Sequence, residues 1–356
     1  MSLVRMLNAA AVASVGACVA ASFVTVGSVT LSAQGPAAKA PAGKWVPERL
    51  ADGHPDLHGV WANNTVTPLE RPKQWEGKTT LTEKEIAELQ GIANQIYDND
   101  GDAQFGDGLI LAVLDKQTNP KSGDKLTGNY NQFWLVGRDW HDRRTSLITD
   151  PPDGKIPAVK PEAKARIEAE QAHRKAHAYE DPEMINLGER CVNFGVPRLG
   201  AGYNSYSQIV QSPGYVTVMA EMAHDARVIP VNGRGHLPSS VRSWNGDAIA
   251  KWDGDTLVVD TTNFSQKSDF RGSHENLHII ERYTRVSHDI LNYEVTIDDP
   301  TVWTKPWTVM IPLKLKNELI FEYACHEGNE AMEGMLKGHR FGEKQGAATK
   351  SNDQQQ

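Results

Sequence analysis

The chain has 356 residues and a formal net charge of −8, from 37 basic and 45 acidic side chains spread along its length. A mildly acidic chain with scattered Lys and Arg lacks the basic patch that nucleic-acid binding needs, so we expect no nucleic-acid partner. The length suits one large domain or two small ones.

The N-terminus has the pattern of a cleaved export signal, residues 1–33. Arg5 supplies a positive start, Met6 to Ala33 carry no charge, and small residues lead into a polar run from Gln34. We expect cleavage near Ala33, a mature charge of about −9, a periplasmic or secreted location and no membrane association after cleavage. Two alternatives are a retained membrane anchor, disfavoured by the weakly apolar Gly, Ser and Thr content, and lipidation of Cys18, disfavoured by the hydrophobic sequence beyond it.

The mature chain is expected to form one β-rich domain. Residues 34–48 are a flexible linker of Ala, Pro, Gly and Lys, which has too little apolar surface to fold. The domain then covers residues 49–342, and residues 343–356 form a disordered tail.

Two helices are expected in the N-terminal half, after a short strand at residues 57–61. Thr82 and Glu85 form a T-x-x-E capping box, and apolar residues recur at helical spacing as far as Ile96. The second helix covers residues 161–179, and its few apolar residues predict a largely solvent-exposed helix.

The segments between these helices are expected to be loops and short strands. Residues 99–128 are rich in Gly, Asp, Asn and Lys, which is typical of a long loop. Residues 131–136 and 145–149 are strand-like, and residues 150–154 have turn chemistry.

From about residue 203 the pattern changes to short β-rich runs separated by turn residues. The predicted strands are Ser207–Gln211, Tyr215–Glu221, Ala226–Val231, Ala248–Trp252, Thr256–Thr261, Leu277–Val286, Ile290–Asp298, Trp307–Leu313 and Leu319–Cys325. Serial strands with tight turns predict an antiparallel meander, which must close or curl to hide its edges. The predicted fold is therefore mainly β, a lipocalin-like barrel or curled sheet with two helices inserted in the N-terminal half.

Two resemblances support this interpretation. Gly59-Val60-Trp61 at the first strand resembles the Gly-x-Trp of lipocalin-like barrels, in which the Trp plugs the closed end. Six further motifs resemble an uncharacterised family of exported soil-bacterial proteins, which implies export and a single folded unit but no activity. They are Gly53–Leu57, Glu189–Cys191, Tyr203–Tyr206, His224–Arg227, Gly254–Asp260 and Tyr323–Asn329.

Cys191 and Cys325 remain after export, and in an oxidising compartment two cysteines of one domain are more often paired than free. We expect a disulfide between them. The alternative is two separate buried thiols.

Polar residues inside apolar strands are the candidate catalytic groups. Alternation places Glu281 on the same strand face as Leu277, Ile279 and Tyr283. A buried carboxylate with a raised pKa beside a His makes an acid–base pair usable near neutral pH. The candidates for catalysis are His224, Asp225, Glu281, Glu322 and His326, of which we expect at least three on one pocket. The candidates for substrate binding are Tyr203, Tyr206, Arg198 and Arg227, since Tyr orients an oxygen and Arg holds an anion.

The same residues also have a structural interpretation. His224, Asp225 and Arg227 would form a hydrogen-bonded cluster, and Glu281 would pair with Arg227 or Arg285 inside the fold. A metal site is a further alternative, assembled from His54, His58, His224, His278, His326, His339, Asp225, Glu281 and Glu327. No local metal-ligand spacing supports it, so we expect neither a metal nor another cofactor.

Three functional hypotheses follow. The first is an exported enzyme that uses general acid–base chemistry of the lyase, dehydratase, isomerase or cyclase type on a small, partly apolar molecule in the barrel. The second is a non-catalytic, lipocalin-like binding protein for such a molecule. The third is a structural envelope protein, favoured if the fold encloses no cavity. The sequence has no Gly-x-Ser-x-Gly elbow, P-loop, Gly-x-Gly-x-x-Gly after a strand or haem-attachment motif.

Overall fold

The computed structural model describes residues 45–99, 102–117, 119–121, 135 and 137–344. These residues belong to one unit, Trp45–Gln356. The predicted export signal, residues 34–44 of the linker, the tail from residue 345 and the predicted strand at 131–136, apart from Leu135, lie outside the described residues.

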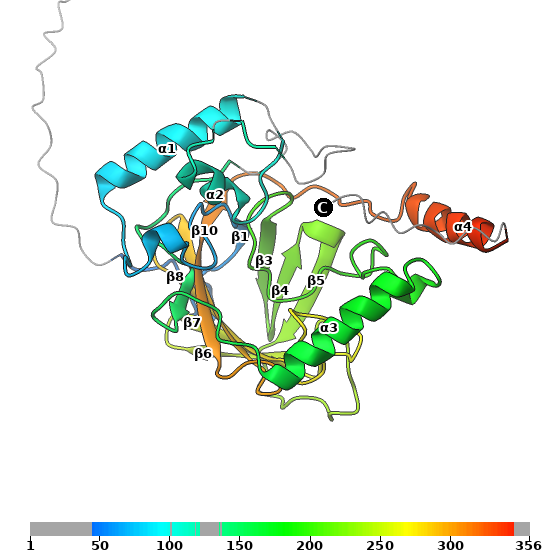
Figure 1. Cartoon of the computed structure of the whole chain (residues 1–356). Coiled ribbons are helices and arrows are strands. Elements are labelled where there is room, and N and C mark those ends of the chain that lie inside the picture. Colours follow the sequence, from blue (N-terminus) through cyan, green and yellow to red (C-terminus); the bar gives the residue numbers. More distant parts are fainter. Residues whose placement is uncertain (1–44, 100–101, 118, 122–134, 136, 345–356) are drawn as a thin grey trace, which may run out of the picture. The chain divides into compact units, whose positions relative to one another are not determined.

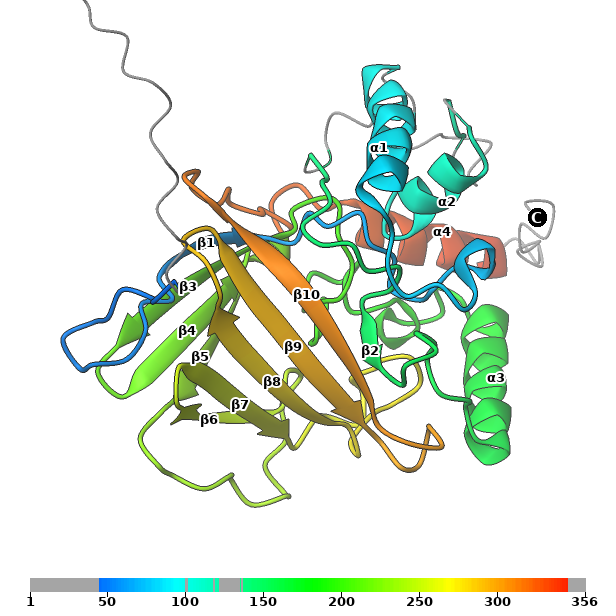
Figure 2. The same cartoon turned by 90° about the vertical axis from the view of Figure 1, so that its left-hand side faces the viewer.

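The alternating apolar runs form a ten-stranded antiparallel sheet that curls into a nearly closed barrel (Figures 1 and 2). This confirms the predicted mainly β fold. The strands are β1 (Gly59–Ala62), β2 (Ile148–Asp150), β3 (Tyr206–Ser212), β4 (Tyr215–Ala220), β5 (Asp225–Pro230), β6 (Asp247–Asp253), β7 (Thr256–Thr262), β8 (His278–Arg285), β9 (Ile290–Asp298) and β10 (Trp307–Lys316).

The strand β1 joins two meanders into one sheet. The order along the sheet is β5-β4-β3-β1-β10-β9-β8-β7-β6, and β2 pairs with β10 off this path. Trp61 lies opposite Ser207 of β3 on one side and Leu315 of β10 on the other. Followed round the barrel, the strands therefore keep chain order, and the N-terminal strand meets the C-terminal one.

The seam of the barrel lies between β5 and β6, where the hydrogen-bonded path ends. Each neighbouring pair along the path is antiparallel. Because the path contains nine strands, an odd number, its two end strands run in the same direction. A parallel pair needs a crossover rather than a tight turn, and residues 231–246 make this connection.

The barrel core is built from the inward faces of the strands. In β9, and in β8 as far as Thr284, the buried and partly exposed residues alternate, as period-2 strands require. Trp61 is fully buried, its Nε1 donates to the Leu57 carbonyl at 3.0 Å, and the Arg285 guanidinium lies 5.5 Å from its ring.

The described residues contain four α-helices, all outside the curled sheet (Figures 1 and 2). In α1 (Glu83–Asp98) the predicted capping box between Thr82 and Glu85 is present. The helix α3 (Pro161–Ala176) is largely exposed, as predicted, and Ala163 is its one buried residue.

Two helices were not predicted from the sequence. The helix α2 (Gly108–Leu114) lies inside the segment predicted to be a long loop, and most of its apolar residues are buried against α1. The loop prediction is wrong for these residues because the apolar run is only seven residues long and is flanked by loop-like sequence. Residues 100–101, 118 and 122–128 of the predicted loop lie outside the described residues. The helix α4 (Ala331–Lys344) follows the barrel and buries none of its residues fully.

The predicted strand at Leu319–Cys325 is also absent, although its apolar residues alternate. The physical reason is that β10 already has β9 on one side and β1 and β2 on the other, so the chain beyond Lys316 finds no free edge beside it. Leu319 and Phe321 are accordingly 85% and 73% exposed.

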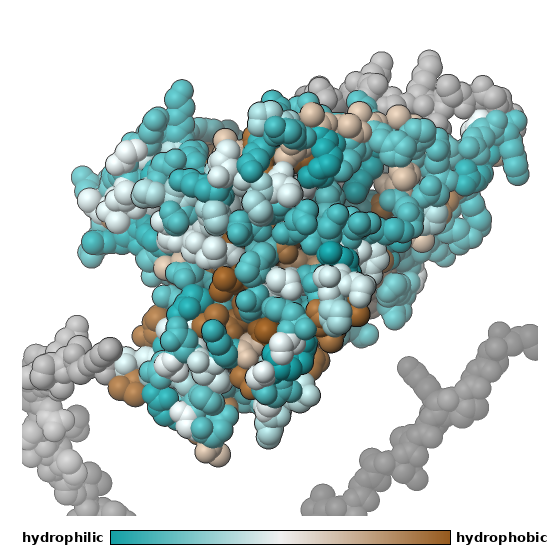
Figure 3. Space-filling view, turned by 90° about the horizontal axis from the view of Figure 1, so that it is seen from below, coloured by the Kyte–Doolittle hydropathy of each residue, from teal (hydrophilic) through white to brown (hydrophobic). Residues whose placement is uncertain are grey.

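On the face drawn in Figure 3, apolar side chains are interspersed with polar ones.

Candidate functional site

A cavity of about 330 Å³ lies inside the barrel. Inward-facing side chains of β3, β4, β5, β8, β9 and β10 form its walls, and residues 194–206, together with Asn63 and Met222, contribute the rest of its lining. Ile209, Val218 and Arg227 occupy one row across β3, β4 and β5. Tyr283 and Tyr293 are paired across β8 and β9. The lining is therefore largely apolar and aromatic with a few charged groups, which is the usual composition of a small-molecule site.

A buried ion pair forms the polar centre of this lining. Arg227 donates from Nη1 to Glu281 Oε1 at 2.9 Å and from Nη2 to Oε2 at 2.6 Å. The Glu281 side chain is 1% exposed and that of Arg227 is 9% exposed. Thr261 Oγ1 accepts a further bond from Arg227 Nη2 at 3.2 Å. Glu281 thus pairs with Arg227, which was one of the two partners in the structural interpretation of the sequence.

Two tyrosines complete the shell of Glu281. The hydroxyls of Tyr283 and Tyr293 donate to Glu281 Oε1 at 3.0 and 2.9 Å. Burial raises the pKa of Glu281, but the charge and hydrogen bonds of Arg227 and the tyrosine bonds outweigh it, so the pKa lies below its usual value. Burial and the negative charge of Glu281 raise the pKa values of both tyrosines well above the ordinary value.

This electrostatic arrangement corrects one expectation. The sequence interpretation required a carboxylate of raised pKa beside a His, whereas Glu281 is held ionised by Arg227. Its two oxygens accept four hydrogen bonds from Arg227, Tyr283 and Tyr293. Glu281 is therefore suited to fixing the position of Arg227 and poorly suited to accepting a proton.

A second, looser charge pair lies beside the first. Arg198 Nη2 is 3.9 Å from Asp225 Oδ2, and Asn245 Nδ2 donates to the same oxygen at 2.8 Å. The Arg198 guanidinium also lies 5.9 Å from the centre of the Phe194 ring. Burial lowers the pKa of Arg198, Asp225 raises it, and repulsion from Arg227 lowers it again, with a net decrease. Arg198 is thus a partly desolvated cation close to a second cation.

Four buried side-chain atoms on cavity-lining residues have no hydrogen-bond partner among the residues that the structure describes. Two are donors, Arg198 Nη2 and Arg227 Nε, and two are acceptors, Asn63 Oδ1 and Asn204 Oδ1. An unpaired polar atom removed from water costs about 1–3 kcal/mol, so proteins rarely gather several of them without a use. Their concentration on one cavity indicates a site prepared for polar groups of a ligand.

The structure brings together six of the nine predicted catalytic and binding residues. Asp225, Glu281, Arg198, Arg227, Tyr203 and Tyr206 all line the cavity. The expectation that at least three of the five catalytic candidates share one pocket is wrong, because only Asp225 and Glu281 of the five line it.

The other three catalytic candidates lie elsewhere. His224 is exposed, because Ala223 and His224 both adopt positive φ angles, 61° and 53°, where the chain turns into β5. Glu322 and His326 are exposed in the segment after β10 that forms no strand. Glu322 lines a separate hollow together with Glu221 and Tyr206.

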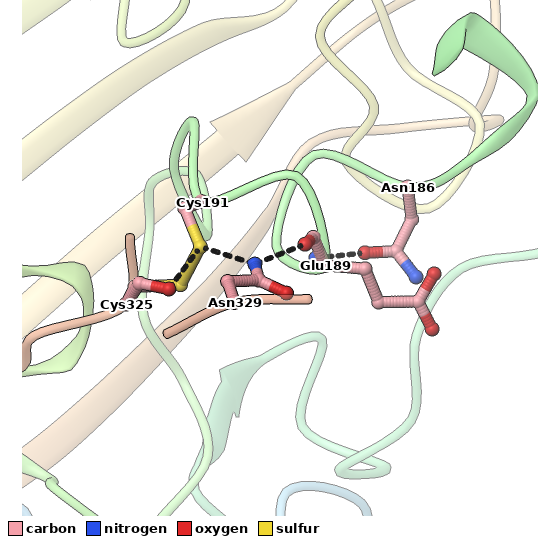
Figure 4. Close-up of a disulfide and its surroundings, with 5 residues drawn as sticks. All are labelled: Asn186, Glu189, Cys191, Cys325 and Asn329. Carbon is pink, nitrogen blue, oxygen red and sulfur yellow. Dashed lines mark hydrogen bonds between the residues drawn. A yellow bond between two sulfur atoms is a disulfide. The ribbon is translucent and has the colours of Figure 1, made fainter. Parts of the chain in front are cut away.

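The predicted disulfide is present (Figure 4). Cys191 and Cys325 have Cα atoms 5.6 Å apart, within the range for a bridge. Asn329 Nδ2 donates to the Glu189 carbonyl at 3.5 Å beside it. The bridge therefore ties the segment that leads into residues 194–206 to the segment after β10.

Several cavity residues were missed in the sequence. Tyr283 shares the inward face of β8 with Glu281. The alternation of side chains along this strand could therefore have predicted that Tyr283 lies in the cavity lining. Phe194 and Asn204 lie in a segment without helical or strand periodicity, and no local pattern indicates where such side chains point.

A larger cleft of about 800 Å³ lies between α3, residues 183–196 and residues 264–277. Several of its polar groups satisfy one another. Glu170 contacts His274 Nε2 at 3.3 Å and Arg166 Nη1 at 3.0 Å, and His274 Nδ1 lies 2.5 Å from the Ser268 carbonyl. We therefore regard the smaller barrel cavity as the candidate site.

Within the described part of the chain, no group of three or more His, Cys, Asp or Glu side chains is placed to hold a metal ion. The same residues include no helix long and apolar enough to cross a membrane. The chain matches no protein-family model, and comparisons with curated proteins and with solved structures also find no match.

Proposed function

We propose that this chain is an exported, lipocalin-like binding protein whose barrel cavity holds a small, partly apolar organic molecule. The observation that carries the proposal is the set of four unpartnered polar atoms on an otherwise largely apolar cavity. Catalysis by Glu281 is disfavoured because Arg227 holds its carboxylate ionised. Export is supported by the N-terminal sequence pattern and by a disulfide, which persists in oxidising compartments.

The proposal is tested with a neutral fluorescent probe, N-phenyl-1-naphthylamine, whose emission rises in an apolar site. Val218 lines the cavity, whereas Val228 on the adjacent strand is 64% exposed. Val218→Phe fills part of the cavity and is expected to abolish the rise, and the matched Val228→Phe is expected to keep it. Thermal melts confirm that both variants fold. An equal rise in both folded variants, or none with the unsubstituted protein, contradicts the proposal.

Asp225 favours a second proposal, that the cavity performs general acid–base chemistry. Its side chain is 21% exposed and lines the cavity, so a ligand can reach it. An enzyme of this kind converts a bound ligand and loses turnover in Asp225→Asn while binding persists. A binding protein returns the ligand unchanged with either side chain. Chromatography of each probe after prolonged incubation separates the two outcomes.

A further inference from the structure

We infer that the ligand of the barrel cavity carries a carboxylate, seated between Arg198 and Arg227. This inference rests on the proposed binding function and narrows it to a chemical class. The two unpartnered donors belong to two guanidinium groups that line the same cavity.

Arg227 presents a donor of fixed position. Glu281 and Thr261 occupy its Nη1 and Nη2 atoms, and its Nε donates to no atom of the described chain. A guanidinium is planar and rigid, so fixing its two terminal nitrogens also fixes the direction of the Nε–H bond. The side chain is 91% buried, since 9% of it is exposed. Arg227 lines the cavity, so this donor has a fixed direction within the cavity lining.

Arg198 is the more loosely paired of the two cations. Its Nη2 is 3.9 Å from Asp225, beyond hydrogen-bond distance, and Asn245 already donates to that Asp225 oxygen. The carboxylate of Glu281, by contrast, is already bound by Arg227 and by the two tyrosines. One loosely paired cation remains, next to a second cation that repels it.

These features favour a monoanion over a neutral group or a dianion. A carboxylate has two oxygens, one for each unpartnered donor, and charge-assisted hydrogen bonds are roughly twice as strong as neutral ones. A neutral carbonyl would leave the repulsion between Arg198 and Arg227 in place. A dianion would bring two negative charges to a site that has a single loosely paired positive charge. The unpartnered oxygens of Asn63 and Asn204 are matching acceptors for a hydroxyl or amine elsewhere on the ligand.

The test compares 4-phenylbutyrate with 4-phenylbutanol, which differ in the carboxylate but share the apolar body. Each displaces the neutral probe from the unsubstituted protein, and we expect the acid to compete at least tenfold better at pH 7. Arg198→Gln should reduce competition by the acid at least tenfold and leave competition by the alcohol nearly unchanged. The control is Arg282→Gln, because Arg282 pairs with Asp253 at the surface and does not line the cavity.

The outcomes distinguish failure of the carboxylate inference from failure of the binding function. Equal competition by acid and alcohol in the unsubstituted protein overturns the carboxylate inference and leaves the binding function standing. Failure of the probe to bind at all overturns the binding function. The comparison within the unsubstituted protein holds even if Arg198→Gln does not fold. Loss of acid binding in the control variant would assign the preference to general surface charge and also overturns the inference.

Discussion

Arg227 on β5 and Glu281 on β8 form a two-bond ion pair although their strands are not neighbours in the sheet. The pair reaches across the seam, where β5 and β6 share no hydrogen-bonded ladder among the described residues. This side-chain contact therefore connects the two ends of the sheet, which backbone hydrogen bonds do not join. Its removal should lower the free energy of unfolding.

Glu281→Ala should lower the free energy of unfolding by about 3–5 kcal/mol, because it leaves Arg227 buried without a partner. Arg227→Met combined with Glu281→Met should lose much less, since apolar side chains of similar volume leave no buried charge unpaired. Urea denaturation of the single and double variants measures both. A double variant as unstable as Glu281→Ala would show that the shape of the pair, and not its charge, matters.

Loss of the disulfide should both destabilise the protein and loosen the cavity. Cys191→Ser with Cys325→Ser should cost about 2–5 kcal/mol of unfolding free energy, as for native bridges in other domains. The residues leading into 194–206 then lose an anchor, so the neutral probe should dissociate faster in stopped-flow measurements. Reductant should reproduce both changes in the unsubstituted protein and have no effect on the double variant. An unchanged dissociation rate would show that the disulfide contributes to global stability but does not hold the cavity lining in place.

Stability should depend on pH through His278 and Asp260, whose Nε2 and Oδ1 atoms are 2.9 Å apart. The hydrogen bond to Asp260 raises the pKa of His278 above 6.5, and the bond to His278 lowers the pKa of Asp260 below 3.8. The His contribution is complete below pH 6.5 and is lost as pH rises through the raised pKa. The Asp contribution is present above pH 3.8 and is lost as pH falls through the lowered pKa.

His278→Gln should therefore reduce stability most between about pH 4 and pH 6.5, and less at pH 9. Urea denaturation across this range measures the difference, which is small because both groups are partly exposed. A penalty that does not change between pH 5.5 and pH 9 would contradict the proposed charge contribution.

Gly246→Ala should disturb the seam more than a matched change at another turn. An added Cβ at Gly246 would lie 2.4 Å from the Thr262 carbonyl oxygen, and the backbone there has a φ of +71°. Gly254 has a φ of +58° with nothing within 4 Å, so Gly254→Ala costs only the left-handed strain of roughly 1–2 kcal/mol. Equal losses in urea denaturation would show that residues around Gly246 move aside freely.

Period-2 alternation was the most reliable guide to the candidate site. It placed Glu281 on a buried strand face, and Arg227 was one of the two arginines, with Arg285, that the sequence analysis named as partners for it. It failed at His224, where two consecutive positive φ angles rotate the side chain outward, a feature that the pattern of apolar residues does not encode. It also failed at Leu319–Cys325, because alternation describes a strand but not whether a neighbouring edge is free. Residues 194–206 show no helical or strand periodicity in the sequence. Their Tyr and Arg side chains were therefore the only ones in this segment predicted to bind a substrate.

The pairing of β1 with β10 has a consequence for how the chain folds. Trp61 pairs with Leu315, so the barrel cannot close until β10 has been made. Closing so long a loop costs chain entropy before any contact compensates for it, which slows folding in proteins dominated by distant pairings. Until then the inner faces and open edges of both meanders are exposed to other chains, and a product that ends before β10 would remain prone to aggregation.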